Sequence, residues 1–252
     1  MSVNGIKAVF YDLDGTLRTS HPSPRDAFAD QAACLGLAMT AEDRLRATRW
    51  EHCYFAESDE VRADRLAFPD SQAFWINYGR RQLIALGASA GIAEELALPL
   101  HQYMNEHYQP DDILMPGVHQ ALKMLKESGR ILAVVSNRDE PYQDYLQEIG
   151  LWEYFDFSLA AGEVNSWKPD RGVFERALQI GAVKADETIY VGDNYYADIV
   201  GARNAGMKPV LLDVRGVFDR PGCPVIQSHT QLLDLLEHED VWTEDRSEFR
   251  AV

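Results

Sequence analysis

Short apolar runs alternate with amphipathic segments along the second half of the chain. Strand-forming residues are concentrated in the runs 131–135, 157–160, 188–191 and 209–212, and an earlier run of the same kind lies at 6–10. The segments between the later runs carry apolar residues at helical spacing. Alternation of buried strands with helices is typical of a parallel sheet that helices cover on both faces. The pattern therefore predicts an α/β fold with a Rossmann-like core.

Proline and glycine residues indicate where several helices of this half begin and end. We expect one to begin at Pro116 and end at Gly129, one to end at Gly150, one to span about 171–180 and one to end at Ala205. A final short helix is expected near 232–236, followed by an acidic C-terminal tail at 239–252 that is held loosely.

The region from about residue 24 to residue 108 has a different pattern of apolar and polar residues. It is helical throughout, and no convincing strand interrupts it. Helices are expected at 24–35, 41–54, 71–86 and 92–108, with Pro99 kinking or breaking the last. An all-helical domain at 18–111 is therefore predicted to be inserted into a core domain formed by 1–17 and 112–238. It leaves the core directly after Leu17, at the end of the first strand.

Charge and composition disfavour several classes of partner and site. The chain has 252 residues and a formal net charge of −16, which disfavours nucleic acid and anionic membranes as partners. Three scattered cysteines are too few for a disulfide framework or a zinc cluster. No signal peptide or membrane span is evident, so we expect a cytoplasmic protein. We also expect it to be a monomer or a homodimer.

Polar groups follow several of the predicted strands, at the sheet edge where ligands of open parallel sheets bind. Any one of them alone is typical of a helix cap, a turn or a surface loop. Together they predict a site. The groups are Asp12 and Asp14, Ser136 and Asn137, Lys168 before Pro169, and Asp193, Asn194 and Asp198 after Gly192.

These residue types suit phosphoryl transfer. Asp12 is a candidate nucleophile, and Asp12 and Asp193 are oxygen donors suited to Mg²⁺. The cation and Lys168 would offset the repulsion between Asp12 and an incoming phosphate. Ser136 Oγ is expected to hydrogen-bond phosphoryl oxygens. Asp198 is expected to orient Lys168 or to reach the metal through water.

The set resembles the haloacid dehalogenase superfamily in each of that family's four motifs. They are present as Asp12-Leu13-Asp14-Gly15-Thr16, Ser136, Lys168 and the Gly192-Asp193 to Asp198 segment, over about residues 5–17 and 112–215. The resemblance implies that Asp12 is the nucleophile and Asp14 the general acid and base. It also implies that Asp12, the backbone carbonyl of Asp14 and Asp193 bind Mg²⁺, and that Asp198 and Asn194 surround these ligands without binding the ion directly. The helical insertion would then be a cap domain.

Asp14 bears on which activity of the superfamily this resemblance implies, dehalogenation or phosphoryl transfer. A halide leaves without a proton, whereas an alkoxide leaving phosphorus needs one. The second acid therefore favours hydrolysis of a small phosphorylated metabolite through an aspartyl-phosphate. The alternatives are a sugar phosphomutase, a haloacid dehalogenase, and a catalytically silent binding module that uses the insertion to hold a partner.

Substrate contacts are predicted at Ser136, Asn137, Lys168 and Arg18, with Thr19 also near the pocket. The insertion offers further polar and aromatic candidates, most of which are expected to be core or surface residues because of their helical spacing. They are Trp50, His52, Tyr54, Phe55, Trp75, Tyr78, Arg80 and Arg81. His101 and His107 are expected on a helix surface, and Tyr195 and Tyr196 either line the pocket or pack on the following helix.

Overall fold

The computed structural model describes residues 5–237 and divides into two compact units. The core unit comprises the chain up to Thr19 and from Leu114 onward, and the helical unit comprises Ser20–Ile113. The predicted domain boundaries at 17/18 and 111/112 lie two residues before these junctions. The predicted C-terminal tail, 239–252, lies outside the described residues.

Among the described residues, six strands form the sheet of the core unit, and every neighbouring pair is parallel. They are β1 (Ala8–Tyr11), β4 (Ile131–Ser136), β5 (Phe157–Ala160), β6 (Thr188–Gly192), β7 (Lys208–Leu212) and β8 (Val225–Ile226), in the order β5-β4-β1-β6-β7-β8. The parallel sheet and its strands at 157–160 and 188–191 confirm the α/β prediction. Strand β8 is too short to have given a sequence signal.

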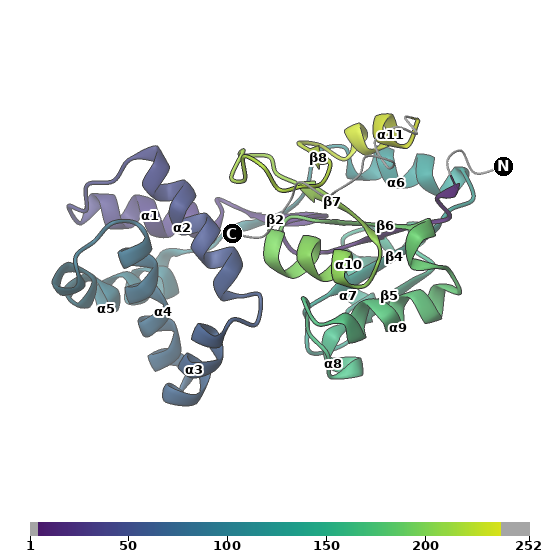
Figure 1. Ribbon diagram of the computed structural model, residues 1–252. Coiled ribbons are helices and arrows are strands. Elements are labelled where there is room, and N and C mark those ends of the chain that lie inside the picture. Colours follow the sequence, from purple (N-terminus) through teal and green to yellow (C-terminus); the bar gives the residue numbers. More distant parts are fainter. Residues whose placement is uncertain (1–4, 238–252) are drawn as a thin grey trace. The chain divides into compact units, whose positions relative to one another are not determined.

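Helices cover both faces of this sheet (Figure 1). They are α6 (Val118–Glu127), α7 (Gln143–Glu148), α8 (Ala161–Val164), α9 (Arg171–Gly181), α10 (Gly201–Asn204) and α11 (Thr230–Glu237). Val9 and Tyr11 of β1 join the apolar cluster under α6, α7 and α11, while Ala8 and Phe10 join the cluster under α8, α9 and α10. Because successive strand side chains point to opposite faces, an almost wholly apolar β1 is required at the centre of the sheet.

Two predictions for the core unit are corrected by the structure. Helix α6 begins at Val118 instead of Pro116, because Gly117 precedes it with a φ of +80°. The single helix expected to end at Ala205 is a wide π-type helix, η4 (Tyr195–Val200), continued by α10. Finally, a short helix that the sequence did not predict, α8, lies between β5 and Lys168. Two short 3₁₀ turns, η2 (Trp152–Tyr154) and η3 (Ala185–Glu187), complete the unit.

The helical unit contains α1 (Pro24–Cys34), α2 (Ala41–Tyr54), α3 (Asp59–Ala67), α4 (Ser71–Ala85) and α5 (Ala90–His107). Each helix begins after a side chain that accepts a backbone N–H of the first turn, which satisfies a donor left unpaired at a helix start. These side chains belong to Ser23, Thr40, Ser58, Asp70 and Ser89. The capping residues account for the accuracy of the predicted starts at Pro24, Ala41 and Ser71.

Helix α3 was missed. Of the two outcomes expected at Pro99, a kink or a break, the break is wrong, because α5 continues through that residue. The apolar residues of α5 pack with those of α1 and α4, and this packing outweighs the lost backbone hydrogen bond. Two strands, β2 (Arg18–His21) and β3 (Asp111–Leu114), pair with each other where the chain leaves and re-enters the core unit. Both are short and largely polar.

Within residues 5–237 no helix combines the length and apolar character needed to span a bilayer.

His52 of α2 is a buried histidine whose charge state couples to stability. Burial, together with the Arg25 guanidinium 3.0 Å from its Nε2, lowers the pKa of His52 to about 3. The unfolded chain, with a histidine pKa of about 6.5, therefore binds an additional proton between pH 6.5 and 3, and stability falls as the pH drops through this window.

We expect the unfolding free energy of the wild-type protein to decrease more steeply below pH 6.5 than that of His52→Gln. The difference should reach about 1.4 kcal/mol per pH unit. Urea unfolding at pH 7.5, 6.0 and 4.5 measures it. His107→Gln replaces an exposed histidine, with a side chain that is 59% accessible, and should follow the wild-type profile. Parallel profiles for wild type and His52→Gln would contradict this assignment.

Candidate active site

The register of the sheet aligns the ends of its central strands. Tyr11, the last residue of β1, pairs with Val134 of β4 on one side and with Val191 of β6 on the other. The residues just beyond these positions therefore meet at one edge of the sheet. They include Asp12, Ser136 and Asp193.

Three carboxylates converge at this edge. One oxygen from each of Asp12, Asp193 and Asp198 lies within 4.8 Å of the others. Asp12 and Asp198 are buried, with 6% and 1% of their surface exposed, and Asp193 is half-buried. Such a cluster of like charges is unfavourable unless cations lie beside it.

Lys168 supplies one such cation. Its Nζ lies 2.6 Å from Asp12 Oδ1 and 2.7 Å from Asp198 Oδ1, and the side chain is 2% accessible. Nζ also contacts the Tyr190 hydroxyl oxygen at 3.0 Å, while Tyr190 donates to the Val135 carbonyl. Although burial alone would lower it, the two carboxylates raise the pKa of Lys168 well above its usual range. The lysine is therefore a fixed positive charge.

Asn137 holds Lys168 in place from the end of β4. Its Nδ2 donates to the Lys168 carbonyl at 3.0 Å, and its Oδ1 accepts the Lys168 backbone N–H at 2.6 Å. Both polar atoms of this amide thus bind backbone in the structure. The sequence had predicted a substrate contact here, and positioning of the lysine was not anticipated. Ser136, the last residue of β4, is 3% exposed.

Thr16 links two of the carboxylates and was not singled out from the sequence. Its Oγ1 lies 3.2 Å from Asp12 Oδ2 and 3.3 Å from Asp193 Oδ1, and it accepts the backbone N–H of Asp193 at 3.0 Å. Its own carbonyl lies 2.8 Å from Nε2 of the buried His229. The hydroxyl fixes the spacing between the loops that follow β1 and β6. Its place at the end of the first motif was the only signal for it.

Two glycines permit this crowding. Gly15 has a φ of +93°, and a Cβ added there would lie 2.4 Å from Asp193 Oδ2. At Gly192 an added Cβ would lie 2.3 Å from the Asp198 carboxyl carbon. The carboxylates of Asp193 and Asp198 therefore lie directly against glycine backbone, which no other residue allows.

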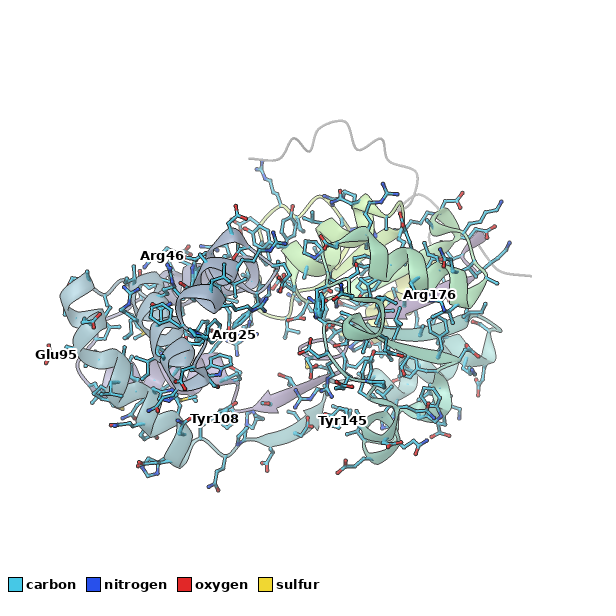
Figure 2. The ribbon with its side chains drawn as sticks, turned by 90° about the horizontal axis from the view of Figure 1, so that it is seen from below. Arg25, Arg46, Glu95, Tyr108, Tyr145 and Arg176 are labelled. Carbon is cyan, nitrogen blue, oxygen red and sulfur yellow. The ribbon has the colours of Figure 1, made fainter. Side chains whose placement is uncertain are left out.

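Asp14 occupies a different environment from Asp12. Its side chain is 40% accessible, and its carboxylate accepts two hydrogen bonds of 3.0 Å from Arg138 and one of 3.0 Å from Arg18. The Arg138 guanidinium in turn lies 4.6 Å from the ring centre of Tyr145, which is labelled in Figure 2. Arg138 was missed because a surface arginine after a strand carries no signal of its own. Arg18, predicted to bind substrate, contacts Asp14.

The segment after β6 is arranged around its own polar residues. Asn194 Oδ1 accepts the backbone N–H groups of Tyr196 and Ala197, and Asp198 Oδ2 accepts that of Asn194. Tyr195 stacks on Phe218, with ring centres 4.9 Å apart. Asp198 is thus hydrogen-bonded through both oxygens, one to Lys168 and one to this loop.

The donor set fits Mg²⁺. Hard divalent cations of this kind take carboxylate and carbonyl oxygens, and here three carboxylates approach one another without a sulfur or imidazole among them. Burial raises the pKa of Asp12 to about 7, against the opposing effect of Lys168. A cation beside Asp12 would favour its ionised form, which is the nucleophilic form of a carboxyl group.

Most candidates from the helical unit contact one another. Tyr54 and Arg81 both bind the buried Asp64, and the Trp50 indole donates to Glu60. Arg80 donates to Asn77, while Phe55 packs on Tyr54 and Tyr78. These contacts are those of a helical core. Trp75, Tyr78 and His101 instead line a pocket of this unit, so the surface position predicted for His101 was incomplete.

Comparison with known proteins gives a consistent family. The sequence model of the haloacid dehalogenase-like hydrolases matches residues 6–206. Haloacid dehalogenase-like hydrolase domain-containing protein 3 of Xenopus laevis is 34% identical over 127 residues, which cover 49% of this chain and 52% of that protein. Ribulose-1,5-bisphosphate 5-phosphatase of Halopiger xanaduensis is 30% identical over 207 residues, 82% of this chain and 84% of that protein.

A solved structure of similar fold is the 2-haloacid dehalogenase from Pseudomonas syringae pv. Tomato DC3000. It covers 92% of this chain and 98% of its own, with 27% identity and a TM-score of 0.50. The names of these proteins thus include both a phosphatase and a dehalogenase.

Proposed function

Since this chain belongs to the haloacid dehalogenase-like hydrolases, we propose that it is a Mg²⁺-dependent phosphatase of a small phosphomonoester, acting through an aspartyl-phosphate on Asp12. The observation that carries the proposal is the pairing of Asp12 with Lys168 at 2.6 Å inside the carboxylate cluster, with Asp14 two residues away. This arrangement supplies a nucleophile, a fixed positive charge and a separate acid and base.

Asp12, Asp193 and the backbone carbonyl of Asp14 are the proposed Mg²⁺ ligands. When bound, the cation would neutralise the negative charge that Asp12 and a phosphate dianion bring together. Asp198 is proposed to position Lys168, because both of its oxygens are already hydrogen-bonded. Lys168 and Ser136 are proposed to bind the phosphoryl oxygens.

The reaction divides into two displacements at phosphorus. An Asp12 oxygen bonds to phosphorus as the ester P–O bond breaks, and Asp14 gives its proton to the departing alkoxide. Asp14, now a carboxylate, then takes a proton from water, whose oxygen attacks phosphorus and releases phosphate from Asp12. Arg138 and Arg18 donate hydrogen bonds to the Asp14 carboxylate and are proposed to position it for both steps.

The proposal is tested with a panel of sugar phosphates, nucleotides and phosphoglycolate. We expect phosphate release with Mg²⁺, its loss with EDTA and its recovery when excess Mg²⁺ is added. Chloroacetate in parallel tests the dehalogenase alternative, which the similarity to the Pseudomonas enzyme favours. Halide release without phosphate release would replace the proposal, and isomerisation of a sugar phosphate without net phosphate release would indicate a phosphomutase.

Gly15→Ala tests the geometry of the active site. The added Cβ collides with the Asp193 carboxylate, so we expect Mg²⁺-dependent phosphate release to fall at least about 100-fold, as misplacement of a catalytic group by about 1 Å does. Gly150→Ala is the matched control, because Gly150 also has a positive φ but nothing within 4 Å of an added Cβ. It should lose stability by about 1 kcal/mol and keep its activity. Equal activity in the two variants would contradict the placement of Asp193.

A further inference from the structure

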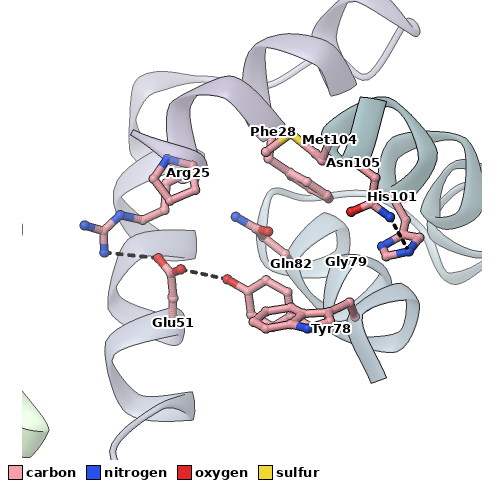
Figure 3. Close-up of a pocket in the computed structure, with 11 residues that line it drawn as sticks. Arg25, Phe28, Glu51, Tyr78, Gly79, Gln82, His101, Met104 and Asn105 are labelled. Atoms are coloured by element: carbon pink, nitrogen blue, oxygen red, sulfur yellow. Dashed lines mark hydrogen bonds and ion pairs between the residues drawn. The ribbon is translucent and has the colours of Figure 1, made fainter. Parts of the chain in front are cut away.

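A pocket of about 220 Å³ lies within the helical unit, between α1, α2, α4 and α5 (Figure 3). Its lining comes entirely from residues 24–105, and none of the carboxylate-site residues takes part. The proposed phosphatase chemistry therefore does not account for it. The apolar part of its lining includes Phe28, Trp75 and Met104.

The charged groups on one side of the pocket neutralise each other. Glu51 accepts the Tyr78 hydroxyl at 2.7 Å through Oε1 and the Arg25 guanidinium at 3.1 Å through Oε2 (Figure 3). An ionic ligand would have to compete with this pair, since the opposite charges already lie side by side. An uncharged ligand meets no such opposition.

Gln82 is the polar group that the fold leaves unused. The residue is 4% exposed, its side-chain amide makes no hydrogen bond within residues 5–237, and its polar atoms are not completely buried. Figure 3 shows this amide pointing into the pocket, between Phe28 and Tyr78. An amide that faces a pocket without a protein partner can hydrogen-bond water or a ligand there. It offers one acceptor and two donor hydrogens.

The rest of the lining sets the shape of the ligand. Small-molecule sites are mostly apolar, with a few polar groups that fix orientation, and this pocket has that composition. Its volume is below the roughly 300 Å³ at which drug-sized sites begin, so it suits one ring with a small substituent. The aromatic side chains Phe28 and Trp75 offer ring faces and edges against which another ring packs.

We propose that this pocket is a binding site for an uncharged, ring-bearing small molecule. Its ring packs among Phe28, Trp75 and Met104, and its hydroxyl or amide group hydrogen-bonds the Gln82 side chain. The same chemistry has two sources, the organic part of a phosphomonoester substrate or a separate effector. The experiments below distinguish them.

Phenol is the probe for this site, and toluene, which has the ring without the hydroxyl, is its matched control. The protein labelled with 5-fluorotryptophan is titrated with each compound and followed by ¹⁹F NMR, with Trp75 assigned through Trp75→Phe. We expect phenol to shift the Trp75 resonance saturably in the millimolar range and to bind about fivefold or more tightly than toluene. Trp152 and Trp167, which lie in the core unit, should not respond.

Gln82→Leu isolates the hydrogen bond. The variant should bind phenol and toluene with affinities within about twofold of each other, because the apolar ring contacts remain. The wild-type comparison of phenol with toluene is decisive on its own if this variant does not fold. Absence of a saturable Trp75 shift, equal affinity of both probes for the wild-type protein, or an undiminished preference in folded Gln82→Leu would each overturn the proposal.

The source of the ligand follows from the effect of phenol on phosphate release. A rise in KM with unchanged kcat identifies the pocket as the site of the organic group of the substrate. An unchanged KM together with the saturable Trp75 shift identifies a separate ligand. Because the NMR titration needs no turnover, failure of the phosphatase panel would remove the proposed function and leave the test of this pocket intact.

Discussion

Asp12→Asn is expected to lower phosphate release at least about 10³-fold, since it removes the attacking oxygen while keeping the shape of the side chain. The loss should appear in kcat for every phosphomonoester that the wild-type protein hydrolyses. The fold should persist, because Lys168 keeps its 2.7 Å contact with Asp198 and Thr16 keeps its hydrogen bond from Asp193. Steady-state phosphate release and circular dichroism of the same preparations measure the two effects.

Asp14→Asn is the matched control for this experiment, because it removes the acid and base and leaves the nucleophile. After brief exposure to a substrate with a good leaving group, we expect acid-quenched Asp14→Asn to carry one phosphoryl group by mass spectrometry, located at Asp12. Asp12→Asn should carry none under the same conditions. Full activity in Asp12→Asn, or a phosphoryl group at another residue, would rule out Asp12 as the nucleophile.

The sequence was most informative where local pattern and chemistry coincide. An apolar run that ends in Asp12 predicts a buried strand with a polar terminus, and the parallel register then brings Asp193 to the same edge. The alternation of strands and helices was enough to predict the α/β fold. Both faces of β1 are buried, and a strand of this kind requires helices on both sides of its sheet.

The remaining parts of the site depend on contacts between distant segments. Arg138 reaches Asp14 across 124 positions of sequence, and Asn137 engages the Lys168 backbone across 31. Neither contact follows from the spacing of residues, since each depends on the path of a loop after a strand. The same holds for Tyr190, whose position on β6 indicates only that it is buried.

The helical unit shows a different limit. Its aromatic and charged residues follow helical spacing, so the sequence does not separate core residues from ligand contacts. The structure separates them by their partners. Arg81 is committed to Asp64 within the unit, whereas Gln82, one position later, has no side-chain hydrogen bond among the described residues and faces a pocket. This residue was not among the sequence candidates, because glutamine within a helix is ordinarily a surface residue.

Lys168→Met should combine the largest loss of stability with a large loss of activity. The substitution leaves Asp12 and Asp198 buried without their cation, and breaking a buried ion pair from one side costs about 3–5 kcal/mol. Loss of a positive charge beside the reacting phosphate should lower kcat by about 10²–10³-fold. Urea unfolding without Mg²⁺ and phosphate release with Mg²⁺ measure these separately. Tyr190→Phe removes no charge: it removes a neutral contact of Nζ and the hydrogen bond that the hydroxyl donates to the Val135 carbonyl, and it should cost about 1–2 kcal/mol.

The double variant Lys168→Met/Asp198→Asn distinguishes a charge effect from a packing effect. If the cost of Lys168→Met arises from uncompensated carboxylates, removing the Asp198 charge should restore about 1–3 kcal/mol of unfolding free energy relative to Lys168→Met alone. Activity should not recover, because the phosphate would still lack the ammonium group. If the two substitutions were simply additive in stability, the lysine would be acting as a packing residue and its pairing with the carboxylates would contribute little.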